Sequence, residues 1–319
     1  MNKNYLKALL FIVIFTCMAI AADILLTYQL RSLDSGEFGI WNRVVTGRAN
    51  ADVLFMGSSR TQVHFDSGRI GAIIGKKSFN LGMDGTPHDL QYSMLQTYLE
   101  HNKPPEIIVQ GIDITSLSRR DGVFKPERYT PYLNEIHLYD KLYSLDKTFW
   151  LNKYVLLYCF GKYGMQLTAP AIKKLLGIND RAGIYADGYA PQDKNWDQNF
   201  EKFKNNNPGG VEYKIDKMEV CDIENIATAA RNTGVDMILV YSPEYTGNHV
   251  LTKNRNQIFD EYLRISNLYH VPLWDYSDEL ISGNTCYFYN SQHLNRKGAS
   301  LFSDSFALRF KAYLSSKNQ

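Results

Sequence analysis

An apolar run suited to a buried strand stops at a Gly-Ser-Ser turn in Ala51-Asp52-Val53-Leu54-Phe55-Met56-Gly57-Ser58-Ser59-Arg60. Such a turn can lift a hydroxyl out of the carboxyl end of a parallel sheet and leave it at the start of a helix. Ligands bind at that edge in open α/β sheets, and backbone N–H groups at a helix N-terminus can stabilise an oxyanion. Taken alone, the tripeptide also fits an ordinary turn or a helix cap.

A second segment, far downstream, places a histidine just before an expected C-terminal helix. It runs Asn290-Ser291-Gln292-His293-Leu294-Asn295-Arg296-Lys297-Gly298-Ala299. A serine hydroxyl is a poor nucleophile until a neighbouring base takes its proton. Ser59 and His293 are therefore a candidate nucleophile and base. The structural alternatives are a helix cap at Ser59 and a surface histidine at the helix start.

Between these segments, short apolar runs alternate with longer amphipathic windows, which predicts an α/β fold with a parallel sheet. The expected strands are Val53–Gly57, Ser78–Leu81, Ile107–Ile112, Met237–Tyr241 and Pro272–Trp274. The expected helices are Asp89–His101, Lys217–Thr233, Leu251–Tyr269 and Arg296–Leu314.

Residues 114–216 break this alternation and are expected to form an insertion in a domain that spans residues 51–315. The insertion is rich in Tyr, Phe and Trp, and its patterning predicts helices from about 135 to 177 and irregular structure after that. The aromatic residues fit a small auxiliary core. They also fit a lid or a sugar-stacking wall over a site.

The N-terminus has the pattern of a membrane anchor over residues 1–31. Lys3 and Lys7 precede a mostly apolar stretch from Ala8 to Leu30, in which Asp23 is the only charge, and Arg31 follows. About 20 apolar residues span a bilayer. Positive charges ahead of the span favour an N-terminus on the inside, which places the rest of the chain outside the cytoplasmic membrane.

Two alternatives to the anchor would also place the rest of the chain outside the cytoplasmic membrane. Ala19-Ile20-Ala21 could be the cleavage site of a signal peptide, although apolarity continues beyond it through Ile24-Leu25-Leu26. Lipidation at Cys17 is a lesser option, because its flanking residues are not small. Residues 32–50 are expected to form a linker with one helix or turn.

Composition excludes several classes of protein. The chain has 319 residues, 45% of them hydrophobic and 21% charged, which is ordinary for a globular protein. A net charge of +2 and the lack of a basic stripe argue against a nucleic-acid partner. The four scattered cysteines do not suit a zinc site, and His64, His88, His249 and His270 show no metal-ligand spacing. No dinucleotide or phosphate-binding loop is present, so we expect no metal and no cofactor.

Three blocks together resemble the SGNH (GDSL-like) hydrolase superfamily. They are Gly57-Ser58-Ser59-Arg60, Asn80-Leu81-Gly82-Met83-Asp84-Gly85 and the stretch from Asn290 to Gly298. The resemblance covers about residues 51–115 and 235–315. It is nearest to a membrane-anchored bacterial envelope branch with relatives of alginate-type O-acetyltransferases and D-alanine transfer proteins. It implies a three-layer α/β/α sandwich with a parallel, flavodoxin-like sheet, preceded by a transmembrane helix.

The resemblance also implies roles for individual residues. Ser59 aligns with the family nucleophile and His293 with its catalytic histidine. The backbone N–H groups of Ser59 and Gly82 would then be the oxyanion donors, although Gly82 also fits a turn that needs glycine.

The sequence departs from the family pattern in two places. Asn290 stands where the family has an aspartate three residues before the histidine, so it can orient the imidazole but cannot stabilise imidazolium by charge. Asp275 or Asp278 could replace the missing carboxylate, or the pair could work as a dyad, or the site could be slow. Gly111-Ile112-Asp113 replaces the family's Gly-x-Asn-Asp block, which leaves a third oxyanion donor unassigned.

Three further residues are candidates for binding substrate. Arg60 directly follows the proposed nucleophile, and Asp113 and Glu244 each follow an expected strand at the same sheet edge. The structural alternatives are an ion pair for Arg60 and a helix cap or turn for Asp113.

The resemblance and the expected location together imply an extracytoplasmic serine esterase or O-acyltransferase. Its substrates would be acyl esters of cell-envelope or exopolysaccharide carbohydrate, and it could have envelope assembly partners. The alternative is a weak or inactive member that binds glycan or partner proteins during polysaccharide assembly. A plain structural anchor would make the paired serine and histidine blocks a coincidence.

Overall fold

Five parallel strands form the centre of the computed structural model, which describes residues 3–178, 187–197 and 199–317. The strand order is β2-β1-β3-β4-β5, the flavodoxin-like order. The strands are β1 (Val53–Met56), β2 (Ser78–Asn80), β3 (Ile107–Ile112), β4 (Asp236–Tyr241) and β5 (Leu273–Asp275). The predicted α/β class with a parallel flavodoxin-like sheet is confirmed.

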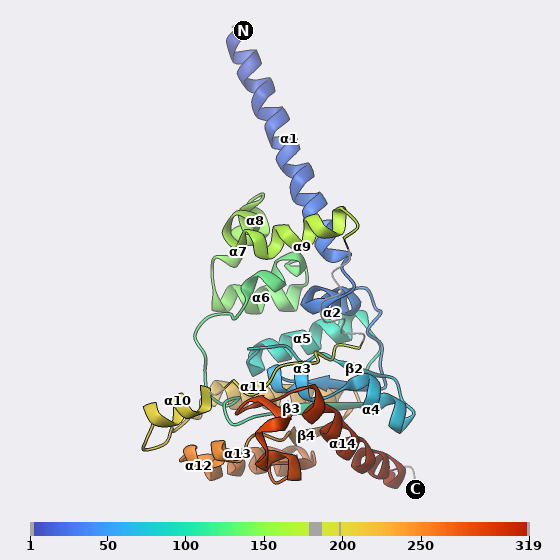
Figure 1. Ribbon diagram of the computed structural model, residues 1–319. Helices are drawn as coiled ribbons and strands as arrows, with labels where there is room; N and C mark the ends of the chain where they lie inside the picture. The colour runs from blue at the N-terminus through green and yellow to red at the C-terminus, as the bar shows by residue number, and fades with distance from the viewer. Residues whose placement is uncertain (1–2, 179–186, 198, 318–319) are drawn as a thin grey trace.

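Helices cover both faces of this sheet (Figure 1), and alternate strand residues belong to different cores. Leu54 and Met56 of β1 pack in one core with α2 (Gly36–Val45), α5 (His88–His101), α11 (Lys217–Asn232) and α13 (Arg255–Tyr269). Val53 and Phe55 pack in the other core with α4 (Ser67–Ile74) and α14 (Arg296–Lys317). The two-residue period of a strand thus separates the two layers of helices. Both faces are covered, as in parallel sheets generally.

The segment expected as a linker contributes to the core. Ile40, Trp41 and Val44 on the inner face of α2 are buried. The Trp41 ring stacks on Tyr132, with centroids 5.5 Å apart. Residues 32–50 are therefore part of the domain rather than a spacer. Their short apolar face was too brief to predict as a packed helix.

The insertion after β3 is helical between 136 and 175, as predicted, with α6 (Ile136–Leu145), α7 (Phe149–Tyr154), α8 (Tyr158–Tyr163) and α9 (Met165–Leu175). The short helix η1 (Pro126–Tyr132) precedes these, and α10 (Asn199–Asn206) lies in the part expected to be irregular. Some of its aromatic residues pack into the main core (Tyr129, Tyr132 and Phe149), whereas Phe160 joins a small satellite core.

One expected helix begins later than predicted. The expected range is Leu251–Tyr269, whereas α13 begins at Arg255 and is separated by a short break from another helix, α12 (Gly247–Leu251). In the break, Val211 donates its N–H to Leu251 O and accepts a hydrogen bond from Lys253 N–H. This pairing requires extended backbone at Thr252, so a contact from the insertion overrides the helical pattern.

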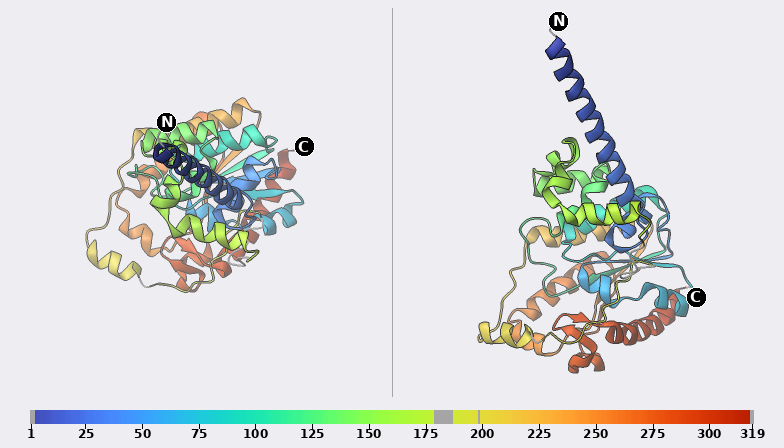
Figure 2. Two further views of the ribbon diagram at one scale, coloured as in Figure 1. Left: turned by 90° about the horizontal axis from the view of Figure 1, so that it is seen from above. Right: turned by 45° about the horizontal axis from the view of Figure 1, so that its top comes forward.

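Helix α1 (Lys3–Arg31) projects from the domain on the side of α8 and α9 (Figures 1 and 2). Among the described residues it is the one helix long and apolar enough to cross a membrane, a property that a signal sequence shares. Its last turns pack on the insertion, where Leu30 meets Phe160 and Leu167. Asp23 Oδ1 accepts a hydrogen bond from Leu157 N–H at 2.9 Å.

Candidate active site

Two glycines bring the start of helix α3 (Ser59–His64) close against the sheet edge. Gly57 and Ser58 make the whole turn between β1 and α3, and Gly57 has φ +148°. A Cβ at Gly57 would lie 2.1 Å from Thr61 Oγ1, and a Cβ at Gly111 on β3 would lie 1.9 Å from the same atom. Only glycine fits at both positions, and Ser59 is thereby held at the carboxyl end of the sheet.

The hairpin before α14 carries His293 to the same place. Strands β6 (Phe288–Asn290) and β7 (His293–Leu294) pair antiparallel, next to the short helices η2 (Leu280–Gly283) and η3 (Thr285–Tyr287). His293 Nε2 lies 2.7 Å from Ser59 Oγ, although the two residues are 234 positions apart. The structure thus brings the proposed nucleophile and base into hydrogen-bond contact.

The side chain of Asn290 fixes the orientation of the imidazole. Its Oδ1 accepts hydrogen bonds from the backbone N–H of Gln292 at 3.0 Å and of His293 at 2.9 Å. The same oxygen lies 2.9 Å from His293 Nδ1. Because two backbone donors identify this atom as the carbonyl oxygen, Nδ1 must carry the proton. The lone pair of Nε2 then faces the Ser59 hydroxyl, which is the tautomer that a general base requires.

Burial keeps this imidazole neutral. Burial, and then the nearby Arg60 cation, lowers the pKa of His293 to about 4, while Asp84 and Asp113 act in the opposite direction. At neutral pH His293 is therefore unprotonated and able to accept a proton. The same environment makes the imidazolium costly when it forms.

No carboxylate replaces the missing aspartate among the hydrogen-bond partners of His293 in the described residues. Asp275 Oδ1 instead accepts a hydrogen bond from Ser277 N–H at 2.8 Å, and Asp278 is exposed. Of the three alternatives, the geometry corresponds to a serine–histidine dyad oriented by a neutral amide.

The two expected oxyanion donors have different surroundings. Ser59 is the first residue of α3, and N–H groups in the first turn of a helix have no acceptor within it. The Gly82 N–H is occupied, because it donates to Asn80 Oδ1 at 2.8 Å. The structure therefore corrects the expected role of Gly82. Glycine is needed there for packing, since a Cβ would lie 2.7 Å from Gln62 N.

The three expected substrate contacts form a buried charged cluster instead. Arg60 lies 3.6 Å from Glu244 Oε2 and stacks over the ring of Tyr241, with its guanidinium carbon 4.5 Å from the centroid. Asp113 accepts a hydrogen bond from Ser58 Oγ at 2.8 Å. All three charged groups are buried, and none lines the cavity at Ser59. Their expected role in substrate binding is corrected to an internal one.

Pairing keeps both acids of this cluster ionised. Burial alone would raise the pKa of Asp113, but Arg60 and the hydroxyls around it lower the pKa to about 2. Burial likewise opposes ionisation of Glu244, yet His249, Arg60, Tyr241 and Arg255 lower its pKa to about 2. The cluster therefore holds Arg60, in the first turn of α3, between two ionised carboxylates.

Ser59 and His293 open into a cavity of about 540 Å³ with a mostly polar lining. Lys125 Nζ lies 3.3 Å from Asp84 and 3.7 Å from Glu37 across this cavity. The full lining is Gly36, Glu37, Ser59, Gln62, Val63, Asp84, Lys125, Ala190, Gln192, Lys194, Tyr289, Asn290 and His293.

Sequence reasoning missed several of these residues. The Tyr289 ring is stacked on His293, and Lys194 Nζ lies 5.2 Å from the centroid of the tyrosine ring. Tyr289 directly precedes Asn290, so its place beside the histidine block was the available signal. Lys125 and Lys194 come from the insertion, and no local pattern marked them.

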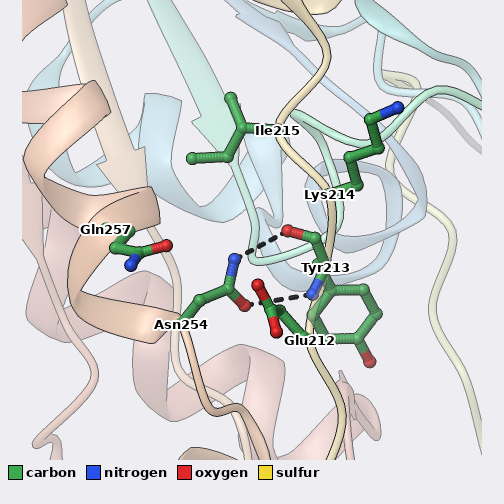
Figure 3. A pocket seen from close by; sticks show the side chains of 6 residues that line it. All are labelled: Glu212, Tyr213, Lys214, Ile215, Asn254 and Gln257. Carbon is green, nitrogen blue, oxygen red and sulfur yellow. Dashed lines mark hydrogen bonds between the residues drawn. The ribbon is translucent and has the colours of Figure 1, made fainter.

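A second cavity, of about 430 Å³, lies between the segment 212–215 and the start of α13 (Figure 3). Asn254 braces that segment, because its Nδ2 donates to Tyr213 O at 2.7 Å and its Oδ1 accepts from Tyr213 N–H at 3.0 Å. Its lining residues include no serine, cysteine or histidine.

Glu100, His101 and Glu135 form the one group within the described ranges whose ligand atoms lie close enough to share a metal ion. It belongs to α5 and the segment before α6, not to the cavity at Ser59. All four cysteines are free.

Similar folds are found among solved structures. A Bacteroides fragilis protein proposed to be an acylhydrolase is 11% identical, with a TM-score of 0.36 over 81% of this chain and 87% of its own. A Streptococcus pneumoniae protein proposed to be a platelet activating factor is 10% identical, with a TM-score of 0.41 over 93% and 96%. A GDSL-like lipase from Bacteroides thetaiotaomicron is 10% identical, with a TM-score of 0.35 over 86% and 99%.

No protein-family model matches the sequence, and no curated protein matches it significantly. Identities near 10% and TM-scores below 0.5 do not identify an activity. The chemistry follows from the geometry of the site alone.

Proposed function

We propose that this protein is a membrane-anchored serine esterase or O-acyltransferase of the SGNH type. It acts outside the cytoplasmic membrane on acyl esters of envelope or exopolysaccharide carbohydrate. The observation that carries this proposal is the chain of contacts from Ser59 Oγ to His293 Nε2 and from His293 Nδ1 to Asn290 Oδ1.

The proposed reaction has two halves. In the first half, His293 Nε2 takes the proton of Ser59 as Oγ bonds to the ester carbonyl carbon, and the carbonyl oxygen becomes an oxyanion beside the Ser59 N–H. The ester C–O bond then breaks, and His293 returns the proton to the leaving alcohol. In the second half, water or a sugar hydroxyl attacks the acyl–serine in the same way and releases Ser59.

With Asn290 in place of an aspartate, the reaction is slower than in a triad with a charged carboxylate, but the site stays active. In a serine protease, replacing the aspartate by asparagine lowers the rate about 10⁴-fold, because the histidine takes the wrong tautomer. Here the two backbone N–H groups hold the amide oxygen toward Nδ1, so the correct tautomer is kept. What is lost is the stabilisation of imidazolium by a negative charge.

The cavity supports a polar substrate with a short acyl group. Lys125, Lys194 and Asp84 offer charged partners for hydroxyl or acidic groups, and Tyr289 offers an aromatic face. A long acyl chain would instead need an apolar channel, because burying it against charged groups leaves those groups without water.

The location rests on α1. Its apolar length suits a membrane span, and Lys3 and Lys7 in its first turns, ahead of the apolar stretch, favour the orientation with the catalytic domain outside.

A fluorophosphonate probe, which reacts with activated serines, tests the proposal. The full chain should be labelled, and Ser59→Ala should abolish labelling. Ser58→Ala is the matched control, because its hydroxyl faces Asp113 rather than His293, and it should still label. Labelling that survives in Ser59→Ala would overturn the assignment. Acetylated oligosaccharide, with and without an acceptor sugar, then separates hydrolysis from transfer.

The neutral Asn290 favours a second candidate, a catalytically weak protein that binds glycan or assembly partners. That function predicts no labelling of the wild type but measurable glycan binding, which is lost when Tyr289 is replaced by alanine.

A further inference from the structure

The outermost helices of the insertion expose large apolar side chains where water would favour polar ones. In α9, Leu167 and Ala171 are buried. Met165, Ile172 and Leu176 are 78%, 45% and 67% exposed. At 3.6 residues per turn Met165 and Ile172 lie within about 20° of one another, on the side opposite the buried pair, and Leu176 directly follows the last residue of the helix. The free face of α9 is therefore an apolar stripe.

Exposed apolar side chains also occur on α7 and in the loop that follows it. Together these side chains form what we call the apical patch: Trp150, Tyr154, Val155, Leu156, Met165, Ile172, Leu175 and Leu176, each at least 41% exposed. In Figures 1 and 2, α7, α8 and α9 form the layer of the domain nearest to the projecting part of α1.

The apical patch lies at the level where a membrane around α1 would end. A hydrocarbon core of about 30 Å corresponds to about 20 helical residues, which reach from Lys7 to about Thr27. Within the last part of that stretch, Asp23 binds the N–H of Leu157, which directly follows Val155 and Leu156 of the patch. These side chains therefore lie beside α1 near the expected outer boundary of the bilayer.

The composition around the patch suits the surface of an anionic membrane. From Asp146 to Ile178 the chain carries five lysines and one acidic residue, Asp146 itself. Lys153 Nζ lies 5.5 Å from the ring centroid of Tyr154, which places a cation beside an exposed aromatic ring of the patch. Trp and Tyr at the headgroup level, with lysine between apolar side chains, are typical of interfacial helices.

We infer that the apical patch rests on the outer surface of the bilayer crossed by α1, as a second contact that binds anionic lipid headgroups. This inference rests on the proposed membrane insertion of α1. Together, α1 and the apical patch fix the tilt of the domain relative to the membrane, whereas α1 alone would let the domain tilt freely. Gly36 and Glu37 of the cavity follow Arg31 by five and six residues, a reach of about 20 Å at most. The cavity is thereby held at a set height above the membrane.

Quenching of tryptophan fluorescence by brominated lipid tests this contact. The full chain is reconstituted into phosphatidylcholine vesicles with phosphatidylglycerol as the minor lipid, with and without bromine on the acyl chains. We expect brominated lipid to quench fluorescence and Trp150→Phe to remove most of that quenching. Trp196→Phe is the matched control, because Trp196 packs beside α10 on Phe200 and Tyr245, and it should leave the quenching in place.

A second variant tests the patch without altering tryptophan. Met165→Asp combined with Leu176→Asp should reduce the quenching of Trp150. Leu308→Asp, at a 65% exposed position on α14, should leave it unchanged. Flotation of the vesicles after an alkaline wash reports α1 separately. Co-flotation without quenching of Trp150 would overturn the inference and leave the anchor intact. Loss of co-flotation in the wild type would overturn the anchor and the inference together.

Discussion

The ring of Tyr289 lies flat on the imidazole of His293, with centroids 5.3 Å apart and planes 11° from parallel. On its edges the same imidazole meets Ser59 Oγ and Asn290 Oδ1. The tyrosine therefore covers one face of the proposed base, and it shares in the burial that keeps His293 neutral.

Replacing Tyr289 by alanine should expose His293 to water. Because burial is the largest cause of its low pKa, the acid limb of the kcat/KM profile should move upward by about one pH unit, toward the ordinary value of 6.5. Tyr289→Phe keeps the ring and should leave the limb in place. An unmoved limb in the alanine variant would show that the tyrosine does not shield the base.

The wild-type pH profile should itself be unusual. Activity needs neutral His293, so kcat/KM should stay level as the pH falls below 6.5 and should drop only near pH 4. Initial rates on a neutral acetyl ester, over a pH range where the enzyme recovers fully after return to pH 7, check this. A limb near pH 6.5 would mean that the histidine is solvated in the working enzyme.

Local pattern was enough to predict most of the fold. The parallel strands are short apolar runs, and burial on both faces produces that pattern whatever the neighbours are. The Gly57 turn and the histidine block were likewise visible, because backbone geometry and chemistry constrain each of them within a few residues.

The other features depend on contacts between distant segments. Val211 pairs with the backbone at Thr252 and so delays the start of α13 to Arg255, and no residue near 252 predicts this. Arg60 follows Ser59 directly, yet it points into the protein because Glu244 and Tyr241, more than 180 residues away, offer it a buried site. The Gly82 N–H was expected to be free, but Asn80 occupies it.

Asn290→Asp should raise the rate. A carboxylate on Nδ1 would stabilise the imidazolium that forms as Ser59 attacks, and a gain of about 10- to 100-fold in kcat corresponds to about 1.4–2.7 kcal/mol. It should also raise the pKa of His293 and hence the acid limb. Asn290→Ala is the opposite control: it removes the acceptor of Nδ1 and should lower kcat below the wild-type value. Equal rates for wild type and Asn290→Asp would mean that imidazolium formation does not limit the reaction.

Stability should fall in mild acid because of buried histidines. Burial lowers the pKa of His88 and His293 to about 4 in the folded chain, against about 6.5 when unfolded. At these two sites the unfolded chain therefore binds more protons, and their contribution to stability is lost as the pH falls from 6.5 to 4. Each group contributes up to about 3 kcal/mol. The Glu219 carboxyl offsets part of this loss, because burial raises its pKa to about 7 and it takes up its proton earlier in the folded chain. Asp113 and Glu244, with pKa values lowered to about 2, lose their contribution only below about pH 4.

The thermal midpoint of the detergent-solubilised chain, measured from pH 7 to pH 4, checks this order. His88→Gln removes one titrating group away from the cavity and should make the decline shallower. A midpoint that stays constant down to pH 4.5 would contradict the assignment.

Gly111→Ala, on β3, should displace α3 and so impair the site. Its Cβ would lie 1.9 Å from Thr61 Oγ1, which forces α3 and Ser59 away from His293. Overpacking of this kind costs about 1–3 kcal/mol, so both the thermal midpoint and the rate of fluorophosphonate labelling should fall.

Adding Thr61→Ala removes the clashing oxygen and leaves the Thr61 Cβ at 3.3 Å, so the double variant should recover most of both losses. Gly161→Ala in α8, where a Cβ meets nothing within 4 Å, is the matched control and should change neither. If Gly111→Ala lowered stability but Thr61→Ala rescued nothing, the contact between α3 and β3 would not be what holds Ser59 in place.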